Sequence, residues 1–216
     1  MKWQEQPINA NFFGQSSFSN PAIVQEASCI KVESALPLEI LAPMGCAMQT
    51  GAGTVFNVVK PVENKTRTLV IFGVGGVGCA AIMAAKVLSD NNKPSVLRNI
   101  IAVDLKDERL DIAQKLGATH TINAREVKDV VATIKKITDG EGADAAVDCT
   151  GSIPVINDMI AAIGPGGLAV TIGAPPVGSK MSIDVFSFIV SCKRYHGSNE
   201  GNSESKTVRS FPRGIP

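Results

Sequence analysis

Three glycines at the start of a predicted helix are the first residues in this sequence that indicate a particular chemistry. Gly73, Gly75 and Gly78 directly follow the apolar segment 68–72 and open a helix predicted over 76–89. In a G-x-G-x-x-G turn the first glycine permits the bend, the second lets the backbone approach a pyrophosphate, and the third lets helix and strand pack closely. The free N–H groups of the helix N-terminus then bind the phosphates. We therefore predict a dinucleotide-binding loop, with a structural glycine turn as the alternative; its residues are Gly73, Val74, Gly75, Gly76, Val77 and Gly78.

A carboxylate stands at the end of the next predicted strand. Asp104 follows the apolar run 99–103, where it can accept hydrogen bonds from both ribose hydroxyls and would repel a 2′-phosphate. This favours NAD over NADP as the cofactor. Arg109 either contacts the ribose or faces solvent. The interval from Gly78 to Asp104 exceeds the usual one of about twenty residues, which we attribute to a polar loop insertion over 89–99.

Strands and helices that alternate along the chain are needed to place the glycine loop and Asp104 at one site. We expect strands over 68–72, 99–103, 120–123, 145–149, 168–172 and 195–198, and helices over 76–89, 107–116, 127–137, 154–163 and 183–192. Asn123 and Glu126 are predicted to form a capping box for the helix that ends near 137. Strands joined by helices require right-handed crossovers. The prediction is thus an α/β fold with a doubly wound parallel sheet, the Rossmann fold.

The first part of the chain does not follow this alternation. Short strands are expected within 22–32 and a helix over about 46–59, with a domain boundary near Gly45. Residues 46–202 are accordingly assigned to the Rossmann domain. The polar, basic segment 203–216 has no pattern and is expected to be a disordered tail. Asp144 and Asp148 are expected to flank a strand near the cofactor edge, with a structural role as caps or as solvated residues.

Composition excludes several other classes of protein. Of 216 residues, 44% are hydrophobic and 19% charged, which is typical of a globular chain. Because 21 Lys and Arg balance 20 Asp and Glu, we expect a small-molecule partner and neither nucleic acid nor membrane. The uncharged run 68–85 is long enough to suggest a membrane span, but its four glycines favour strand, turn and helix. The five cysteines form no C-x-x-C pair and no secretory signal is found, so a reduced, cytoplasmic protein is expected.

Six segments, which follow one another along the chain, are similar in sequence to segments of one known family. They are NFFGQSSF (11–18), GCAMQTGAG (45–53), the glycine loop, IAVD (101–104), KLGAT (115–119) and IGAPP (172–176). Together they resemble the zinc-containing medium-chain alcohol dehydrogenases, in particular the aryl-alcohol dehydrogenase-like branch. The resemblance implies that Thr50 and the backbone of Ile172, Gly173 and Ala174 lie against the nicotinamide, and that Asp104 and Arg109 hold the adenosine ribose. It also implies that Cys46 is one of three protein ligands of a catalytic zinc.

The resemblance further implies that the catalytic site is incomplete in this sequence. The family's other two zinc ligands have no counterpart, and neither His120 nor His196 matches one. We therefore expect a chain truncated at both ends, with residues 1–45 as the remnant of a GroES-like catalytic domain. Hydride transfer between an alcohol or aldehyde and NAD is then expected to be impaired, and no catalytic residue is assigned. The family often assembles through the edge strand of this domain, so a homo-oligomer is expected.

Other interpretations stay open. Without the resemblance, Cys46 is better explained as an ordinary buried thiol. A non-catalytic NAD-binding module would keep the loop and Asp104 without turnover, and zinc content would distinguish it from the enzyme. A zinc-free quinone reductase-like protein is disfavoured by the Gly45-Cys46 pair. An S-adenosylmethionine methyltransferase also uses a glycine-rich turn and an acid, but it leaves Thr50 and 172–176 without a role.

Overall fold

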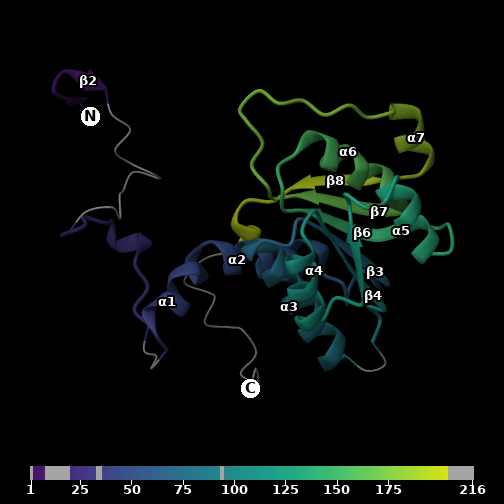
Figure 1. The fold of residues 1–216 in the computed structure, drawn as a ribbon, viewed down its shortest axis with the longest axis horizontal. Coiled ribbons are helices and arrows are strands. Elements are labelled where there is room, and N and C mark those ends of the chain that lie inside the picture. The colour runs from purple at the N-terminus through teal and green to yellow at the C-terminus, as the bar shows by residue number, and fades with distance from the viewer. Residues whose placement is uncertain (1, 8–19, 33–35, 93–94, 204–216) are drawn as a thin grey trace. The chain divides into compact units, whose positions relative to one another are not determined.

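A computed structural model describes residues 2–7, 20–32, 36–92 and 95–203. The chain divides into two compact units, residues 1–36 and 37–216. The second unit contains a six-stranded sheet in the order β5-β4-β3-β6-β7-β8, in which every neighbouring pair is parallel (Figure 1). The chain winds outward from the central strand to one edge and then crosses to build the other half. This is the doubly wound strand order, so the predicted Rossmann fold is confirmed.

The secondary structure of the second unit alternates as predicted. Its strands are β3 (Thr68–Phe72), β4 (Asn99–Asp104), β5 (His120–Asn123), β6 (Ala143–Asp148), β7 (Ile163–Thr171) and β8 (Arg194–Gly197). Its helices are α1 (Leu38–Leu41), η2 (Ala42–Gly45), α2 (Ala47–Gly53), the π-helix η3 (Thr54–Val59), α3 (Gly76–Asn91), α4 (Asp107–Lys115), α5 (Val130–Ile137), α6 (Ile153–Ala162), α7 (Val185–Val190) and η4 (Glu200–Asn202). β3 and β5 have the predicted bounds. The loop insertion predicted over 89–99 is helical at its start, because α3 extends to Asn91.

Helices cover both faces of the sheet, and each face has its own core (Figure 1). On β3, Leu69 and Ile71 belong to the core that also contains residues of α2 and α3, whereas Val70 and Phe72 belong to the core that contains residues of α6. All five residues of β3 are buried. Because successive side chains of a strand point to opposite faces, a strand covered on both sides must be apolar throughout. This explains the uncharged run that precedes the glycine loop.

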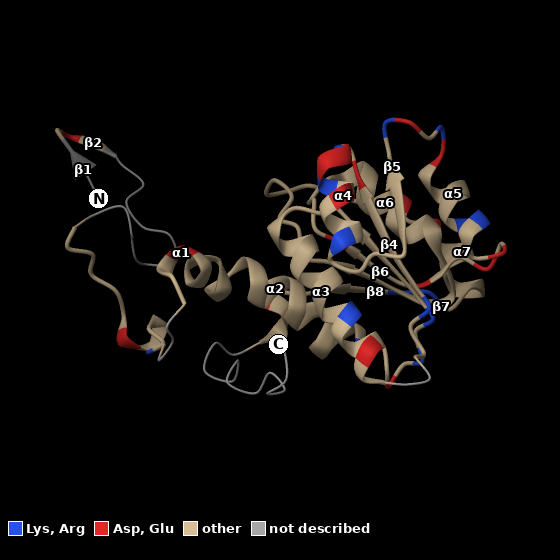
Figure 2. Ribbon diagram, turned by 60° about the horizontal axis from the view of Figure 1, so that its bottom comes forward, with Lys and Arg blue, Asp and Glu red and all other residues tan. Residues whose placement is uncertain are grey.

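Local sequence signals account for the ends of α4. Asp107 and Glu108 lie in its first turn and Lys115 in its last, an arrangement that the helix dipole favours. Figure 2 colours the acidic and basic residues of α4 red and blue. The chain turns after the helix at Gly117, whose φ is +118°. A left-handed conformation of this kind favours glycine. The predicted end of this helix at residue 116 is confirmed to within one residue.

The entrance of α5 differs from the prediction. The helix begins at Val130, and the side chain of Asp129 caps it by accepting the Ala132 N–H at 2.8 Å. The predicted capping box is wrong: Asn123 Oδ1 accepts the Arg125 N–H at 3.0 Å, which makes a turn and not a helix start. A carboxylate is as good a cap as an asparagine, and residues 124–128 are left to connect β5 to the helix.

Two strand predictions also need correction. β7 starts at Ile163, because the glycine-rich segment 164–167 continues the strand through a register shift against β6 between Ala143 and Ala145. The strands expected within 22–32 are absent from that segment, which holds only the 3-10 helix η1 (Glu26–Ser28). Ile23 there is 88% exposed, so the apolar residues of the segment have no core to favour a strand.

The described residues of the first unit also contain the antiparallel pair β1 (Lys2–Trp3) and β2 (Gln6–Pro7). The segment 11–18 and residues 204–216 of the expected tail lie outside the described residues. The boundary at residue 45 and the GroES-like origin of residues 1–45 remain predictions. Within the described residues, no helix combines the length and hydropathy needed to cross a membrane.

Candidate cofactor-binding site

The three glycines of the loop between β3 and α3 are required for three different reasons. Gly73 has a φ of +84°, and a Cβ there would lie 2.6 Å from Cγ2 of Thr150. A Cβ on Gly78 would collide with the carbonyl oxygen of Gly73, so the helix can pack on the turn only without a side chain. A Cβ on Gly75 would have no neighbour within 4 Å. The middle glycine therefore leaves open space over the backbone, as the approach of a pyrophosphate requires.

The N-terminus of α3 is available to an anion. Gly75 is its N-cap, and no side chain caps the helix. The first backbone bond of the helix runs from the Cys79 N–H to the Gly75 carbonyl at 2.9 Å. The N–H groups of Gly76, Val77 and Gly78 thus belong to the unpaired first turn, where the helix dipole adds partial positive charge. With the open space beside Gly75, this end of the helix fits a phosphate group.

Asp104 connects the end of β4 to the glycine loop. Its side chain is 6% exposed. Oδ2 accepts the Val74 N–H at 2.9 Å, and Oδ1 accepts the N–H groups of Leu105 at 2.8 Å and Lys106 at 3.1 Å. Nη1 of Arg109 lies 3.6 Å from Oδ2. A carboxylate has about four acceptor sites, and three backbone N–H groups already occupy Asp104. Asp104 can therefore accept hydrogen bonds from both ribose hydroxyls, as predicted, only if one of these backbone hydrogen bonds lengthens.

A cleft of about 450 Å³ opens where β3, β4 and β6 end. Its lining residues are Phe72, Gly73, Gly75, Val103, Asp104, Leu105, Arg109, Ala124, Val130, Cys149, Thr150, Ser152, Val155 and Asp158. In a doubly wound sheet, ligands bind outside the carboxyl ends of the strands, where the winding direction reverses. The structure therefore brings Gly73, Gly75, Asp104 and Arg109 together in one cleft at that position.

Sequence reasoning missed much of this lining. Val130 lies at the start of α5, and Val155 and Asp158 lie on α6. The motifs in the sequence mark only the ends of the strands and the glycine turn. The first turns of the helices that follow the strands also reach this edge, and that topological rule is the signal that could have found these residues.

A buried carboxylate organises the loop after β6. Asp148 Oδ1 accepts the Thr150 hydroxyl at 2.6 Å, the Thr150 N–H at 2.9 Å and the Gly151 N–H at 3.3 Å. Burial raises the pKa of Asp148, and these hydrogen bonds act in the opposite direction. Its predicted structural role is confirmed.

The two cysteines beside the cleft are poor nucleophiles. Burial raises the pKa of the Cys149 thiol far above its usual range, and the charges of Asp148 and Cys79 act in the same direction. Burial also raises the pKa of Cys79. Because a thiolate and not a thiol is the nucleophile, neither cysteine is suited to covalent catalysis. Cys149 packs against the core that contains Leu69 and Ile71, and the Cys79 thiol donates to the Val74 carbonyl at 3.5 Å.

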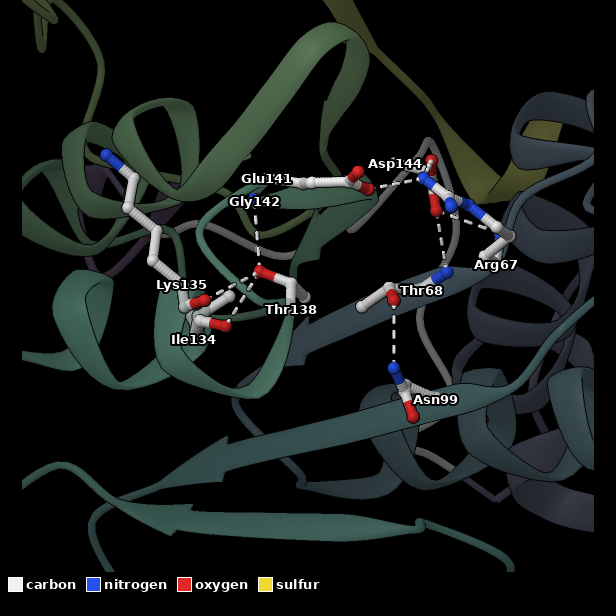
Figure 3. A network of polar contacts seen from close by, with 9 residues as sticks. All are labelled: Arg67, Thr68, Asn99, Ile134, Lys135, Thr138, Glu141, Gly142 and Asp144. Atoms are coloured by element: carbon white, nitrogen blue, oxygen red, sulfur yellow. Dashed lines mark hydrogen bonds and ion pairs between the residues drawn. The ribbon is translucent and has the colours of Figure 1, made fainter.

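Asp144 lies at the opposite edge of the sheet (Figure 3). Its Oδ2 accepts the backbone N–H groups of Arg67 at 2.9 Å and Thr68 at 2.8 Å, and Nη2 of Arg67 lies 2.6 Å from Glu141. The predicted structural role is confirmed, although Asp144 binds the start of strand β3 and is not the cap of a helix, and the predicted place near the cofactor edge is wrong. Asp144 lies at the amino end of β6, whereas a cofactor binds at the carboxyl ends of the strands.

The residues expected at the nicotinamide lie outside the lining of this cleft. Thr50 is buried within α2. The N–H groups of Ile172 and Gly173 both donate to the Asp148 carbonyl at 3.0 Å, and a Cβ on Gly151 would lie 2.7 Å from the Ala174 carbonyl carbon. The segment 172–174 thus packs on the loop after β6. The contacts of these four residues with a nicotinamide remain predictions.

The described residues do not fit a catalytic zinc. Cys46 is exposed at the N-cap of α2, which overturns the alternative of a buried thiol. Among the residues that the structure describes, no group of three or more His, Cys, Asp and Glu is arranged to hold a metal ion. A catalytic zinc needs three protein ligands. His120 and His196 are exposed, as expected for surface residues.

Comparison with known proteins gives consistent results. A family model described as zinc-binding dehydrogenase matches residues 76–211. Geraniol dehydrogenase of Castellaniella defragrans is 38% identical over 169 residues, which cover 78% of this chain and 43% of that protein. A probable alcohol dehydrogenase of Pseudomonas sp. is 31% identical over 203 residues, which cover 92% of this chain and 60% of that protein.

Solved structures show the same similarity. Benzyl alcohol dehydrogenase of Acinetobacter calcoaceticus superposes with a TM-score of 0.81 at 38% identity, covering 91% of this chain and 51% of that one. An alcohol dehydrogenase zinc-binding domain protein of Burkholderia ambifaria superposes with a TM-score of 0.78 at 40% identity, covering 94% and 52%. The chain thus spans about half the length of most of these relatives.

Proposed function

The chain belongs to the zinc-binding dehydrogenase family, and from this premise we propose that residues 46–202 are the NAD-binding domain of an alcohol dehydrogenase. One observation carries the proposal. The open space at Gly75, the uncapped N-terminus of α3 and the carboxylate of Asp104 meet in one cleft at the carboxyl edge of the sheet. The binding groups for a phosphate and for a ribose thus lie next to each other, as a dinucleotide requires.

In the proposed complex, different residues bind different parts of NAD. The N–H groups of Gly76, Val77 and Gly78 hold the pyrophosphate, with Val74 and Gly73 shaping the loop. Asp104 accepts from a ribose hydroxyl and disfavours a 2′-phosphate, while Arg109, 3.6 Å away, steadies the carboxylate. From the family resemblance, Thr50, Ile172, Gly173 and Ala174 lie against the nicotinamide. NAD, when bound, supplies the hydride chemistry.

The substrate and setting are proposed from the relatives. Geraniol and benzyl alcohol dehydrogenases are named for primary alcohols, so the proposed substrate is a small alcohol or its aldehyde, aryl substrates included. A homo-oligomer and a cytoplasmic location are also proposed. Because the described residues do not complete a zinc site around Cys46, no catalytic step through zinc is derived. The same observation favours a second candidate, an NAD-binding module without turnover.

Titration calorimetry of the purified 216-residue chain with NADH and NADPH, combined with elemental analysis for zinc, tests the proposal. NADH binding that is tighter than NADPH binding is the expected result. About one zinc per chain together with alcohol oxidation would favour the enzyme, and NADH binding without zinc would favour the module. Tighter binding of NADPH would overturn the role of Asp104. No binding of either nucleotide would overturn the proposed function.

A further inference from the structure

The short turn after β8 has a backbone conformation that is rare for its residue types. Glu200, Gly201 and Asn202, which form η4, have φ values of +49°, +67° and +49°. Only glycine adopts this left-handed region at little cost, so the other two residues of the turn are strained. Such a run persists only where the surrounding structure holds it in place, and strain of this kind is concentrated at functional sites.

The turn is held against α2 and η3 (Figure 1). A Cβ on Gly53 would lie 2.9 Å from the Gly201 carbonyl oxygen, and a Cβ on Gly201 would lie 2.7 Å from the Thr54 nitrogen. The two glycines therefore allow the helix and the turn to meet backbone to backbone. Asn57 Nδ2 donates to the Gly201 carbonyl at 3.0 Å and to the Asn202 carbonyl at 3.4 Å. Close packing and a side-chain amide thus both fix the turn on this helix.

The helix that holds the turn also carries Thr50. Thr50 lies three residues before Gly53 on α2. The Thr54 hydroxyl donates to the Thr50 carbonyl at 2.8 Å, and both threonines are buried. A hydrogen-bonded helical segment moves as a unit, so a displacement of Gly53 from the turn would displace Thr50 as well.

On its other side the turn is connected to the strand that precedes the segment 172–174. β8 pairs with β7, and the Ser198 N–H donates to the Thr171 carbonyl at 3.0 Å. Residues 198–202 therefore link the two parts of the chain that are proposed to lie against the nicotinamide, Thr50 and the segment 172–174.

We infer that Gly53 and Asn57 are positioning residues for the nicotinamide of NAD: they fix the turn 200–202 and so set the place of Thr50 relative to the segment 172–174. The inference rests on the proposed function. Neither residue contacts the cofactor itself. The groups proposed for the pyrophosphate and the adenosine ribose lie on other elements, α3 and β4. A change at the turn should therefore weaken the binding of the nicotinamide end of NAD alone.

The test is a calorimetric titration of the full chain with NADH and with ADP-ribose, which lacks the nicotinamide. Gly53→Ala places a methyl group against the Gly201 carbonyl and the Ser203 hydroxyl, so the turn must move away from α2. We expect the NADH affinity of this variant to fall about tenfold, as for one lost hydrogen bond. Its ADP-ribose affinity should stay within about twofold of the wild type.

Asn57→Asp is a second variant, which does not require the fold to accept a new methyl group. It keeps the shape of the side chain but replaces the donor by a carboxylate, which repels the two carbonyl groups of the turn. Its NADH affinity should fall about threefold to tenfold, with little change for ADP-ribose. The matched control is Asn64→Asp, because Asn64 Nδ2 donates to the Val59 carbonyl at 2.7 Å and lies at the amino edge of the sheet. This control should keep the wild-type ratio of the two affinities.

The outcomes separate this inference from the function on which it rests. A ratio of NADH to ADP-ribose affinity that falls in Gly53→Ala and Asn57→Asp but not in Asn64→Asp supports the positioning role. A merely structural role would change both affinities equally, so an unaltered ratio in a folded variant overturns the role of the residue replaced. Equal binding of the two ligands by the wild type overturns the inference while the NAD site stands. Failure of the wild type to bind either ligand overturns both.

Discussion

Replacing Gly75 by alanine should separate cofactor binding from folding. Its φ of −75° is accessible to alanine, and a Cβ there would meet no atom within 4 Å. Alanine is a poorer N-cap than glycine, by up to about 1 kcal/mol. The lower entropy of the unfolded chain offsets about 0.4–1 kcal/mol of that cost. We therefore expect the free energy of unfolding of Gly75→Ala to stay within about 0.5 kcal/mol of the wild type.

The effect on NADH binding should be much larger. The new methyl group would occupy the space beside the first-turn N–H groups, through which a pyrophosphate must approach. Loss of one charge-assisted hydrogen bond costs about 1.5–3 kcal/mol, so the affinity for NADH should fall by about tenfold to a hundredfold.

Calorimetry gives the affinity of Gly75→Ala, and urea unfolding gives its stability. The matched control is Gly197→Ala in β8, where a Cβ also has no neighbour within 4 Å. That variant should bind NADH like the wild type. Unchanged NADH affinity in Gly75→Ala would refute the proposed position of the pyrophosphate.

Gly78→Ala should instead destabilise the fold by about 1–3 kcal/mol in urea unfolding, because its Cβ collides with the Gly73 carbonyl and the loop must shift; wild-type stability would contradict this packing. Asp104→Asn should reduce the preference for NADH over NADPH in calorimetry, because it removes the charge that repels a 2′-phosphate; an unaltered preference would exclude Asp104 as its cause. Burial raises the pKa of Asp148 in the folded chain, so the folded chain binds the carboxyl proton more tightly than the unfolded chain. The free energy of unfolding of the wild type, relative to that of Asp148→Asn, should therefore fall as the pH rises from the ordinary carboxyl pKa through the raised one. Urea unfolding at several pH values checks this, and a difference that grows in favour of the wild type would show the opposite pKa shift.

Residues whose role depends on the local backbone were predictable from the sequence. The glycine loop follows from the conformations and close contacts that only glycine allows, and the bounds of β3 follow from an apolar run covered on both faces. Asp104 was found because the end of a strand next to such a loop is a fixed position in a doubly wound fold. In each case a short stretch of sequence contains the physical cause.

Residues whose role depends on contacts between distant elements were not predictable. Asp129 caps α5 in place of Asn123, and both residue types are good caps, so local sequence did not distinguish them. Asp158 and Val155 reach the cleft only because α6 packs beside α5 at the carboxyl edge of the sheet. Asp144 was predictable as a residue of the amino end of β6, and its expected place near the cofactor was wrong because only the carboxyl ends of parallel strands face that site.

The most direct test of the proposed cofactor site is to map the backbone amide resonances that shift when NADH is added to the chain. The structure predicts shifts at Val74, Gly76 and Val77 in the loop and at the end of β4, with none at the opposite edge around Arg67 and Asp144. Shifts concentrated at that opposite edge, or no shifts in the glycine loop at saturating NADH, would contradict the proposed site.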